Sequence, residues 1–184
     1  MKWVLRILGA VVGLIVLAVL ALYLAGFRRG HGRNSVTVEI ARPPAQVFRY
    51  LTDDELVKRW VGGLVEIKHL NADVPGVGAR MHMVEEYKGE SVPMDMEITG
   101  FEANRAIKFR IISAGDPSEG FTEAGEYVLE PTGTGTRLTL SATSEYQGFL
   151  PRLFEPLITP EAQKKLKEDL ARLKGLVEGE PPQH

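Results

Sequence analysis

The most hydrophobic stretch of the chain lies at its N-terminus. From Ile7 to Phe27 there are 21 residues without a charged side chain. At about 1.5 Å per residue, a helix of this length spans about 31 Å, close to the hydrocarbon thickness of a bilayer. Trp3 and Tyr23 stand where aromatic side chains meet the membrane interfaces, and basic residues flank both ends of the run. The pattern predicts a single-pass membrane anchor with basic flanks over residues 1–33.

A cleaved signal peptide is the competing interpretation of this run. Its apolar region is typically about 7–15 residues long and is followed by small residues spaced like Ala-x-Ala. The run here is longer, and the segment 23–26 (YLAG) offers no clean cleavage site. We therefore expect an uncleaved anchor. Two basic side chains precede the run and three follow it, so the positive-inside rule leaves the side of the membrane open.

The rest of the chain repeatedly alternates apolar and polar residues, which is typical of β-strands. After a short polar linker at 30–34, strands are expected at 36–40, 64–70, 79–87, 90–99, 105–113, 121–130 and 136–146. Glycine, asparagine and proline residues lie between them. The short connections favour antiparallel neighbours.

Two short helices are expected after the first strand. The first begins at Pro43-Pro44, because proline suits a first helical turn. The second begins with a capping box, with Thr52 as N-cap and Glu55 at position N3, and ends near Trp60.

A long helix is expected at the C-terminus. Thr159 is the expected N-cap and Pro160 the first helical residue. Alternatively, the apolar segment 149–158 extends the helix, with a bend at Pro156 or Pro160. Apolar residues recur at steps of four, four, three and four and form one stripe: Ala162, Leu166, Leu170, Leu173 and Val177. A disordered tail is expected at 179–184.

This order of elements predicts one α+β domain over residues 34–178. A single antiparallel sheet needs a cover for its apolar face, and only the C-terminal helix is long enough to provide it. We expect a curved sheet of about seven strands wrapped around that helix, with the two short helices closing one end.

Four methionines are expected to meet on the inner face of the sheet. If residues 88–89 form a two-residue turn, Met83 lies opposite Met94 and Met81 lies opposite Met96. Methionine is unbranched and polarizable, so this patch favours a deformable apolar pocket. Plain filling of the core and binding of cuprous copper by thioethers are the alternatives.

The last hairpin is expected to add to the same wall. A four-residue loop at 132–135 pairs Tyr127 with Leu140 and Leu129 with Leu138, all facing inward. Beside the four methionines, the expected cavity residues are Trp60, Phe109, Ile111, Tyr127, Leu140, Phe154 and Ile158.

Glu85 and Glu123 also fall on the inward face. Buried carboxylates are costly unless paired, so they sit at an open end, contact a ligand or pair with a cation. A register slip or a bulge would instead place them outside. The arginines considered as partners are Arg80, Arg105 and Arg110. With His69 and Tyr127, the two glutamates are the candidates for a general acid or base, whereas His82 is expected to point away from the cavity.

Charge and composition exclude several other classes. Residues 34–184 carry 17 basic against 24 acidic side chains, about −7, which makes this part a poor partner for nucleic acid. The chain has no cysteine, and its four histidines form no close pair, so no metal site is expected. Phosphate-binding, nucleophile-elbow and zinc-protease motifs do not occur, and no cofactor is indicated.

Several stretches resemble the START-like, polyketide-cyclase-like (SRPBCC) superfamily. In VTVEIARPPAQVFRYLTDDELVKRW a strand leads into a proline-started helix with an aromatic residue, and a second helix ends in tryptophan. VGARM, MEITGFEANRAIKFRI and YVLEPTGTGTRLTLSAT resemble its middle and last strands, and LKEDLARLKGLVE its C-terminal helix. The resemblance covers residues 35–178 and implies a helix-grip fold with a cavity between sheet and long helix. The positions that match the pattern are Pro44, Phe48, Trp60, Gly78, Gly135 and Thr136.

The superfamily has no shared catalytic residues, so the resemblance implies a range of functions. Members commonly bind lipids, sterols, quinones, hormones or polyketides, some are cyclases or dehydratases, and a related branch stimulates a heat-shock chaperone. The leading hypothesis is a membrane-anchored binding protein for a small apolar ligand, such as a lipid, a quinone or a polyketide-like molecule. The alternatives are a cyclase- or dehydratase-like enzyme using a cavity carboxylate or histidine, and a protein-interaction module of the chaperone-activator type. The oligomeric state stays open.

Overall fold

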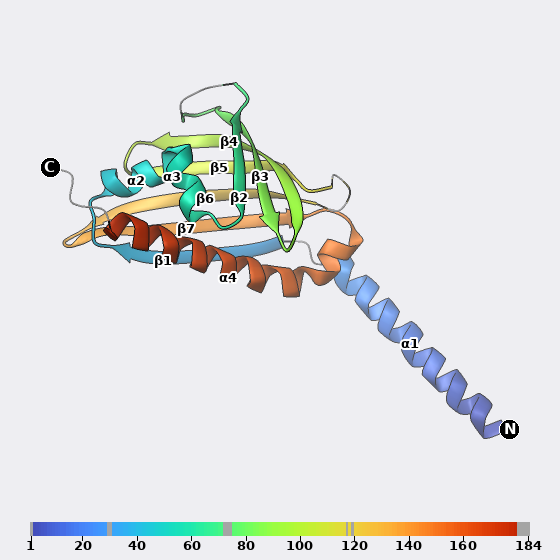
Figure 1. Cartoon of the computed structure of the whole chain (residues 1–184). Helices are drawn as coiled ribbons and strands as arrows, with labels where there is room; N and C mark the ends of the chain where they lie inside the picture. The colour runs from blue at the N-terminus through green and yellow to red at the C-terminus, as the bar shows by residue number, and fades with distance from the viewer. Residues whose placement is uncertain (1, 29–30, 72–74, 117, 119, 180–184) are drawn as a thin grey trace.

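The computed structural model describes residues 2–28, 31–71, 75–116, 118 and 120–179 (Figure 1). One antiparallel sheet has the strand order β1-β7-β6-β5-β4-β3-β2. Its strands are β1 (His31–Ile40), β2 (Leu64–His69), β3 (Arg80–Tyr87), β4 (Glu90–Glu102), β5 (Ala106–Ala114), β6 (Phe121–Thr132) and β7 (Gly135–Tyr146). The helices are α1 (Lys2–Arg28), α2 (Pro44–Thr52), α3 (Asp54–Trp60) and α4 (Phe149–Gly179).

The predicted helix-grip architecture is confirmed. The sheet curves around α4, and α2 and α3 lie together at one end of the sheet (Figure 1). The strand β1 is longer than expected, because its first residues pair with β7 from His31↔Glu145 to Asn34↔Ala142. The polar linker predicted at 30–34 is therefore wrong for 31–34, and residue 30 lies outside the described residues. Pairing with β7 extends this strand beyond its own hydrophobic alternation.

The register of the central hairpin is as predicted. Met83 pairs with Met94 and Met81 with Met96 across β3 and β4. The turn works because Lys88 and Gly89 both take the left-handed backbone conformation, with φ of 52° and 85°, which suits the twist of a two-residue hairpin.

The last hairpin also has the predicted register. Tyr127 pairs with Leu140 and Leu129 with Leu138. Its loop is shorter than expected, because Thr132 and Gly135 still pair with each other. Two residues, and not four, therefore make the turn.

The predicted capping box at the start of α3 is wrong. Asp53 is the N-cap, and its carboxylate accepts the backbone N–H groups of Glu55 at 3.0 Å and Leu56 at 3.2 Å. Thr52 still belongs to α2, where its hydroxyl donates to the carbonyl of Phe48 at 3.1 Å. Asp53 has an extended backbone between the two helices, the geometry that an N-cap requires.

The predicted start of the long helix at Thr159 is also wrong. α4 begins at Phe149 and runs through Pro156 and Pro160, so the extension kept open from the sequence is confirmed. The Thr159 hydroxyl donates to the Glu155 carboxylate at 2.9 Å, one turn back in the same helix. Gly179 is the last residue of α4, and the rest of the predicted tail, 180–184, lies outside the described residues.

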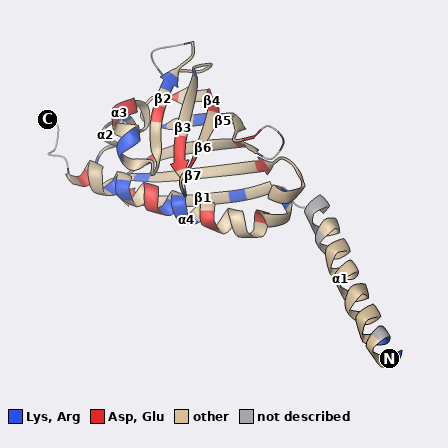
Figure 2. Cartoon of the chain, turned by 45° about the vertical axis from the view of Figure 1, so that its right-hand side comes forward, with Lys and Arg blue, Asp and Glu red and all other residues tan. Residues whose placement is uncertain are grey.

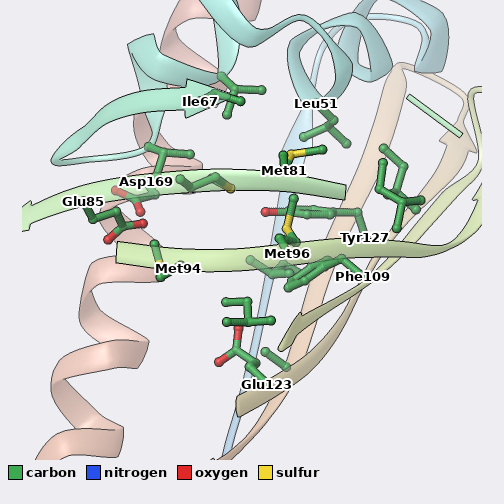
Figure 3. Close-up of a pocket in the computed structure, with 18 of the residues that line it drawn as sticks. Leu51, Ile67, Met81, Glu85, Met94, Met96, Phe109, Glu123, Tyr127 and Asp169 are labelled. Carbon is green, nitrogen blue, oxygen red and sulfur yellow. The ribbon is translucent and has the colours of Figure 1, made fainter. Parts of the chain in front are cut away.

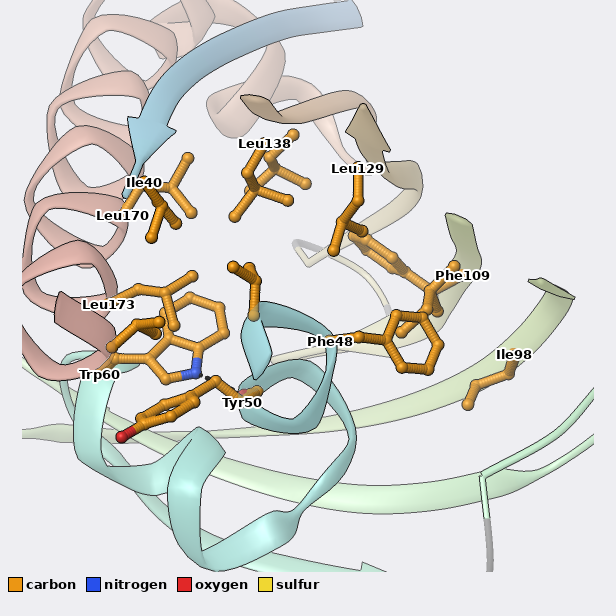
Figure 4. Close-up of a cluster of buried hydrophobic side chains, with 14 of the residues drawn as sticks. Ile40, Phe48, Tyr50, Trp60, Ile98, Phe109, Leu129, Leu138, Leu170 and Leu173 are labelled. Atoms are coloured by element: carbon orange, nitrogen blue, oxygen red, sulfur yellow. Dashed lines mark hydrogen bonds between the residues drawn. The ribbon is translucent and has the colours of Figure 1, made fainter. Parts of the chain in front are cut away.

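The end of the sheet near α2 and α3 is a packed hydrophobic core (Figure 4). Trp60 closes it from α3, and its indole N–H donates to the carbonyl of Tyr50 at 2.8 Å. α4 contributes Leu170, Leu173 and Val177, each at most 1% exposed. These three residues belong to the predicted apolar stripe, so the stripe positions α4 over the sheet.

Gly63, between α3 and β2, lies against the backbone of β3. Its φ is +84°, and a Cβ there would lie 2.3 Å from the carbonyl oxygen of Glu86. Gly89 has nearly the same φ, +85°, but open space around it. We expect Gly63→Ala to lower the free energy of unfolding by about 3 kcal/mol, and Gly89→Ala by about 1 kcal/mol, because only the first adds a backbone clash to the conformational strain. Denaturant unfolding of the two variants measures the difference. Equal losses would contradict the close approach of Gly63 to the Glu86 carbonyl.

The N-terminal helix α1 extends away from the sheet (Figure 1). Its segment Lys2–Ala21 is long and apolar enough to cross a membrane, as is also true of some signal sequences. Near its other end, the ring of Tyr23 lies 5.3 Å from that of Phe149 in the first turn of α4. α1 therefore joins the domain at the start of α4.

Candidate functional site

A cavity of about 170 Å³ lies between the concave face of the sheet, α3 and α4 (Figure 3). Its volume is close to the roughly 150 Å³ of an apolar protein cavity that holds benzene, and below the range of about 300–1,000 Å³ for drug-sized ligands. It therefore encloses a group of about one ring or a short chain.

All four methionines of the predicted patch line this cavity, and Figure 3 labels Met81, Met94 and Met96. Met81 and Met94 are buried, and Met83 and Met96 are partly buried. They come from β3 and β4, whose confirmed register puts the four thioethers on one wall. This wall is apolar and flexible in shape.

Most of the other predicted cavity residues are on the wall too. Those that line it are Trp60, Phe109, Ile111, Tyr127 and Leu140. Phe154 and Ile158 do not line it, and Phe154 is 49% exposed. The reason is that α4 is one continuous helix, and its first turns lie beyond the cavity. Four further wall residues were not assigned to the cavity from the sequence, although one of them, Leu166, belongs to the predicted apolar stripe: Leu51, Val57, Ile67 and Leu166.

Tyr127 lies at the centre of the aromatic part of the wall. Its ring centroid is 5.6 Å from that of Phe109, and Trp60 approaches it at 6.4 Å in an edge-on arrangement. Gly125 leaves room for the Phe109 ring, since a Cβ there would be 2.3 Å from its Cζ. Burial raises the pKa of the Tyr127 phenol. Within the described residues its hydroxyl has no hydrogen-bond partner, so it is a donor available to a ligand.

A cluster of charged side chains forms another part of the wall, and Figure 3 labels two of its members, Glu85 and Asp169. Lys165 of α4 lies 3.1 Å from the Glu85 carboxylate and 3.1 Å from that of Asp169. Asp169 also accepts the backbone N–H of Gly62 at 3.0 Å and pairs with Arg172. The cluster therefore connects β3, α4 and the residues after α3.

The cation at this wall is Lys165 and not one of the three arginines named from the sequence. Arg80 and Arg110 both pair with Glu97, and Arg105 pairs with Glu102, so none of the three holds Glu85 or Glu123. Of the alternatives left open for the two glutamates, pairing with one of these arginines is excluded, because the cationic partner of Glu85 comes from α4 and not from the sheet. Lys165 and Asp169 stand four residues apart beside the apolar stripe, and this spacing is the signal in the sequence that could have found them.

The electrostatics of Lys165 follow from its two neighbours. Burial by itself lowers the pKa of the Lys165 ammonium, but the Glu85 and Asp169 carboxylates outweigh it, and the net pKa is raised. Lys165 is therefore charged at neutral pH and stays paired with both carboxylates.

Glu123 lies on the cavity wall as well, with a different environment. The Ser144 hydroxyl donates to its carboxylate at 2.6 Å. Burial raises the pKa of the Glu123 carboxyl and prevails over the opposing effects of Ser144 and Lys165, while Glu85 raises the pKa further. Both inward glutamates thus face the cavity, and the register slip that would have placed them outside does not occur.

None of the histidines that the structure describes, at positions 31, 69 and 82, lines the cavity. The Nε2 atom of His69 lies 2.7 Å from the Asp54 carboxylate. On the same strand, β2, a bulge after Leu64 turns Val65 outward. His82 contacts Asp95 at 2.7 Å, away from the cavity as predicted. Among the residues that the structure describes, no three or more histidine or acidic side chains gather to hold a metal ion.

The raised pKa of Glu123 predicts a pH dependence. A native state that favours the protonated carboxyl loses stability as pH rises through the folded-state pKa. Glutamine mimics the protonated form at every pH. We expect Glu123→Gln and the unsubstituted chain to be about equally stable below the ordinary pKa of 4.5, and the variant to become the more stable one towards pH 7.

Denaturant unfolding at several pH values checks this expectation. Glu66→Gln, at an exposed position on β2, is the matched control and should show no such trend. A difference between Glu123→Gln and the unsubstituted chain that is constant with pH would contradict the assigned environment of Glu123.

The curved sheet, the long helix and the apolar cavity between them give the domain a helix-grip fold, and together with the match to a family model they place it in the START-like SRPBCC class that the sequence resemblance predicted. The model of the family described as "Polyketide cyclase / dehydrase and lipid transport" matches residues 31–178, and the chain belongs to this family. The family and the cavity together make this part of the chain a domain for hydrophobic ligands.

Solved structures with the same fold share little sequence with the chain. Protein MLL2253 from Mesorhizobium loti is 23% identical, with a TM-score of 0.61, covering 79% of this chain and 96% of its own. TTHA0849 from Thermus thermophilus is 23% identical, with a TM-score of 0.61 and coverage of 80% and 96%. Ara h 8.0201 is 16% identical, with a TM-score of 0.65 and coverage of 80% and 98%. None of the curated protein sequences compared with the chain matches it.

Proposed function

We propose that the chain is a membrane-anchored binding protein for a small, uncharged apolar ligand. The cavity between the sheet and α4 holds the ligand, and α1 is a single-pass anchor that keeps the cavity near a bilayer. The observation that carries the proposal is the cavity wall itself, with four methionines and an aromatic cluster around about 170 Å³. A lipid, a quinone or a polyketide-like molecule has an apolar part of the required kind.

The charges of the wall argue for an uncharged ligand. Among the described residues that line the cavity, Lys165 is the one cation beside Glu85, Glu123 and Asp169, and it already pairs with two of these carboxylates. Asp169 also pairs with Arg172. An anionic head group would have to displace a carboxylate from Lys165 and would lie near Glu123, and an unpaired buried charge is costly. A hydroxyl or carbonyl group on the ligand meets no such penalty, and the free Tyr127 hydroxyl is a suitable donor to it.

The test compares two probes of similar size and different charge. 4-Propylphenol is uncharged at neutral pH, whereas 4-propylbenzoate is an anion. A ligand that binds the native state raises the temperature of unfolding, so we expect the phenol to stabilise the full chain in detergent micelles and the benzoate not to. Equal or greater stabilisation by the benzoate would overturn the proposed ligand class.

A second candidate function rests on Glu123. A buried carboxyl with a raised pKa, on the wall of an apolar cavity, suits a general acid in a dehydratase-like or cyclase-like reaction. To test this, the molecule bound to the purified chain is extracted and its mass is measured. If Glu123 is catalytic, the molecule bound to Glu123→Gln differs in mass from the one bound to the unsubstituted chain, for example by one water. Identical molecules from the two chains would leave the binding function and exclude a catalytic role for Glu123.

A protein-interaction module is the remaining alternative. It predicts a filled core, and the cavity disfavours it.

A further inference from the structure

The first turns of α4 expose four large apolar side chains. This α4 patch consists of Phe149, Leu150, Phe154 and Leu157, which are 39%, 49%, 49% and 67% exposed. Contiguous exposed apolar patches mark contacts with proteins or membranes. None of the four residues lines the cavity, so ligand binding does not explain them.

The α4 patch has a sharp boundary along the helix. Leu150, Phe154 and Leu157 follow one another at steps of four and three and lie on one face. The next exposed positions on that face are Glu161 and Lys164. Charged residues are concentrated in the part of α4 farther from α1 (Figure 2). The apolar surface is therefore confined to the end of α4 that adjoins α1.

A hydrogen bond to the end of β7 helps to hold this segment in its orientation. The guanidinium Nε of Arg152 donates to the carbonyl of Tyr146 at 3.0 Å, and Tyr146 is buried at the end of β7. Arg152 lies on the side of the helix opposite Leu150 and Leu157. With Arg152 bound to the end of β7, the apolar side chains on the opposite side of these turns face outward.

The α4 patch begins where α1 meets the domain. Phe149 contacts Tyr23, whose ring lies 5.3 Å away. Tyr23 stands four residues before the end of the uncharged run at Phe27, which is about 6 Å along the helix axis. If α1 crosses a bilayer, Tyr23 lies at the boundary of acyl chains and head groups, and Phe149 lies at the same depth. From Phe149 the patch extends about 12 Å along α4 to Leu157.

We propose that the α4 patch inserts into the head-group and acyl-chain boundary of the leaflet from which α1 emerges, as a second membrane contact. This inference rests on the proposed anchoring by α1. A second copy of the chain would also cover the patch, but it would not account for the contact of Phe149 with α1 at interface depth. The basic residues that follow the uncharged run at positions 28, 29 and 33 suit anionic head groups.

Insertion of the α4 patch orients the domain on the membrane. α4 then leaves the bilayer surface beyond Leu157, and the cavity residue Lys165 follows eight residues later, about 12 Å along the helix. The cavity is held close to the leaflet, so an apolar ligand dissolved in lipid has a short path to it.

The absence of cysteine from the sequence makes site-specific labelling straightforward. The full chain with Leu157→Cys carries an environment-sensitive NBD fluorophore and is reconstituted into vesicles of phosphatidylcholine and phosphatidylglycerol. Lys164→Cys, exposed on the same face two turns later, is the matched control. With spin-labelled lipid in the vesicles, we expect about two-fold quenching of the fluorophore at position 157 and little at 164.

A third label separates the inference from the anchoring on which it rests. Val16→Cys lies in the middle of the uncharged run, where a spin label deep in the acyl chains should quench the fluorophore. Quenching at 16 and 157 supports both claims. Quenching at 16 with none at 157 overturns the second contact and leaves the anchor intact, and no quenching at either position overturns both. A different result would be a fluorophore at position 157 that is shielded from water to a degree set by the protein-to-lipid ratio and is not quenched by the spin label. A second copy of the chain would then cover the patch, and the proposal would be overturned.

Discussion

Replacing Asp169 by alanine is expected to lower the free energy of unfolding by about 3 kcal/mol. The side chain is 4% exposed. It pairs with Lys165 and Arg172 of its own helix α4 and accepts the backbone N–H of Gly62, which follows α3. Its loss leaves Glu85 as the one carboxylate partner of Lys165 among the described residues and removes the acceptor from the Gly62 N–H. Denaturant unfolding of the full chain in detergent measures the effect.

Two further variants sharpen this prediction. Asp169→Asn keeps an oxygen acceptor for the Gly62 N–H but removes the charge, so we expect about half the loss of the alanine variant. Glu168→Ala changes the neighbouring exposed residue of α4 and should cost less than about 0.5 kcal/mol. Similar losses for Glu168→Ala and Asp169→Ala would show that the cluster at the cavity wall does not hold α4 in place.

Filling the cavity is expected to abolish ligand binding without unfolding the domain. Met83 lies on the wall and is partly buried, and tryptophan at this position would occupy much of the roughly 170 Å³ beside it. We expect the stabilisation by 4-propylphenol to disappear in Met83→Trp, which corresponds to at least about ten-fold weaker binding. Thermal unfolding with and without the phenol measures it.

The matched control for this variant is Met83→Leu, which nearly conserves the side-chain volume. It should keep the stabilisation by the phenol, and its stability without ligand should change by less than about 1.5 kcal/mol. If Met83→Trp binds 4-propylphenol as well as Met83→Leu does, the phenol is bound elsewhere and the cavity is not the ligand site.

The sequence was most informative where a single local rule determined the result. Two-residue periodicity and one tight turn were enough to place Met83 opposite Met94, and the same periodicity put Glu85 and Glu123 on the inner face. These positions follow from strand geometry alone. The helix-grip fold followed in the same way, since one long helix was available to cover one sheet.

The sequence was least informative where two elements compete for a residue or meet in space. Thr52 and Asp53 both suit an N-cap, and the choice depends on where α2 ends. In the sequence pattern Lys165 is one of many solvated lysines of α4, and it becomes part of the cavity through its distance to Glu85 on β3. A pairing between a helix and a strand 80 residues apart in the sequence leaves no periodic signal.

The central claim is that the cavity holds an uncharged apolar molecule, and native mass spectrometry of the full chain tests it most directly. The chain is released from detergent micelles in the mass spectrometer, and the molecules bound to it are also extracted and their masses measured. We predict a discrete, uncharged apolar species bound one to one, which Met83→Trp lacks and Met83→Leu retains. A chain that is free of ligand, and stays so when lipids and quinones are added, would contradict the claim.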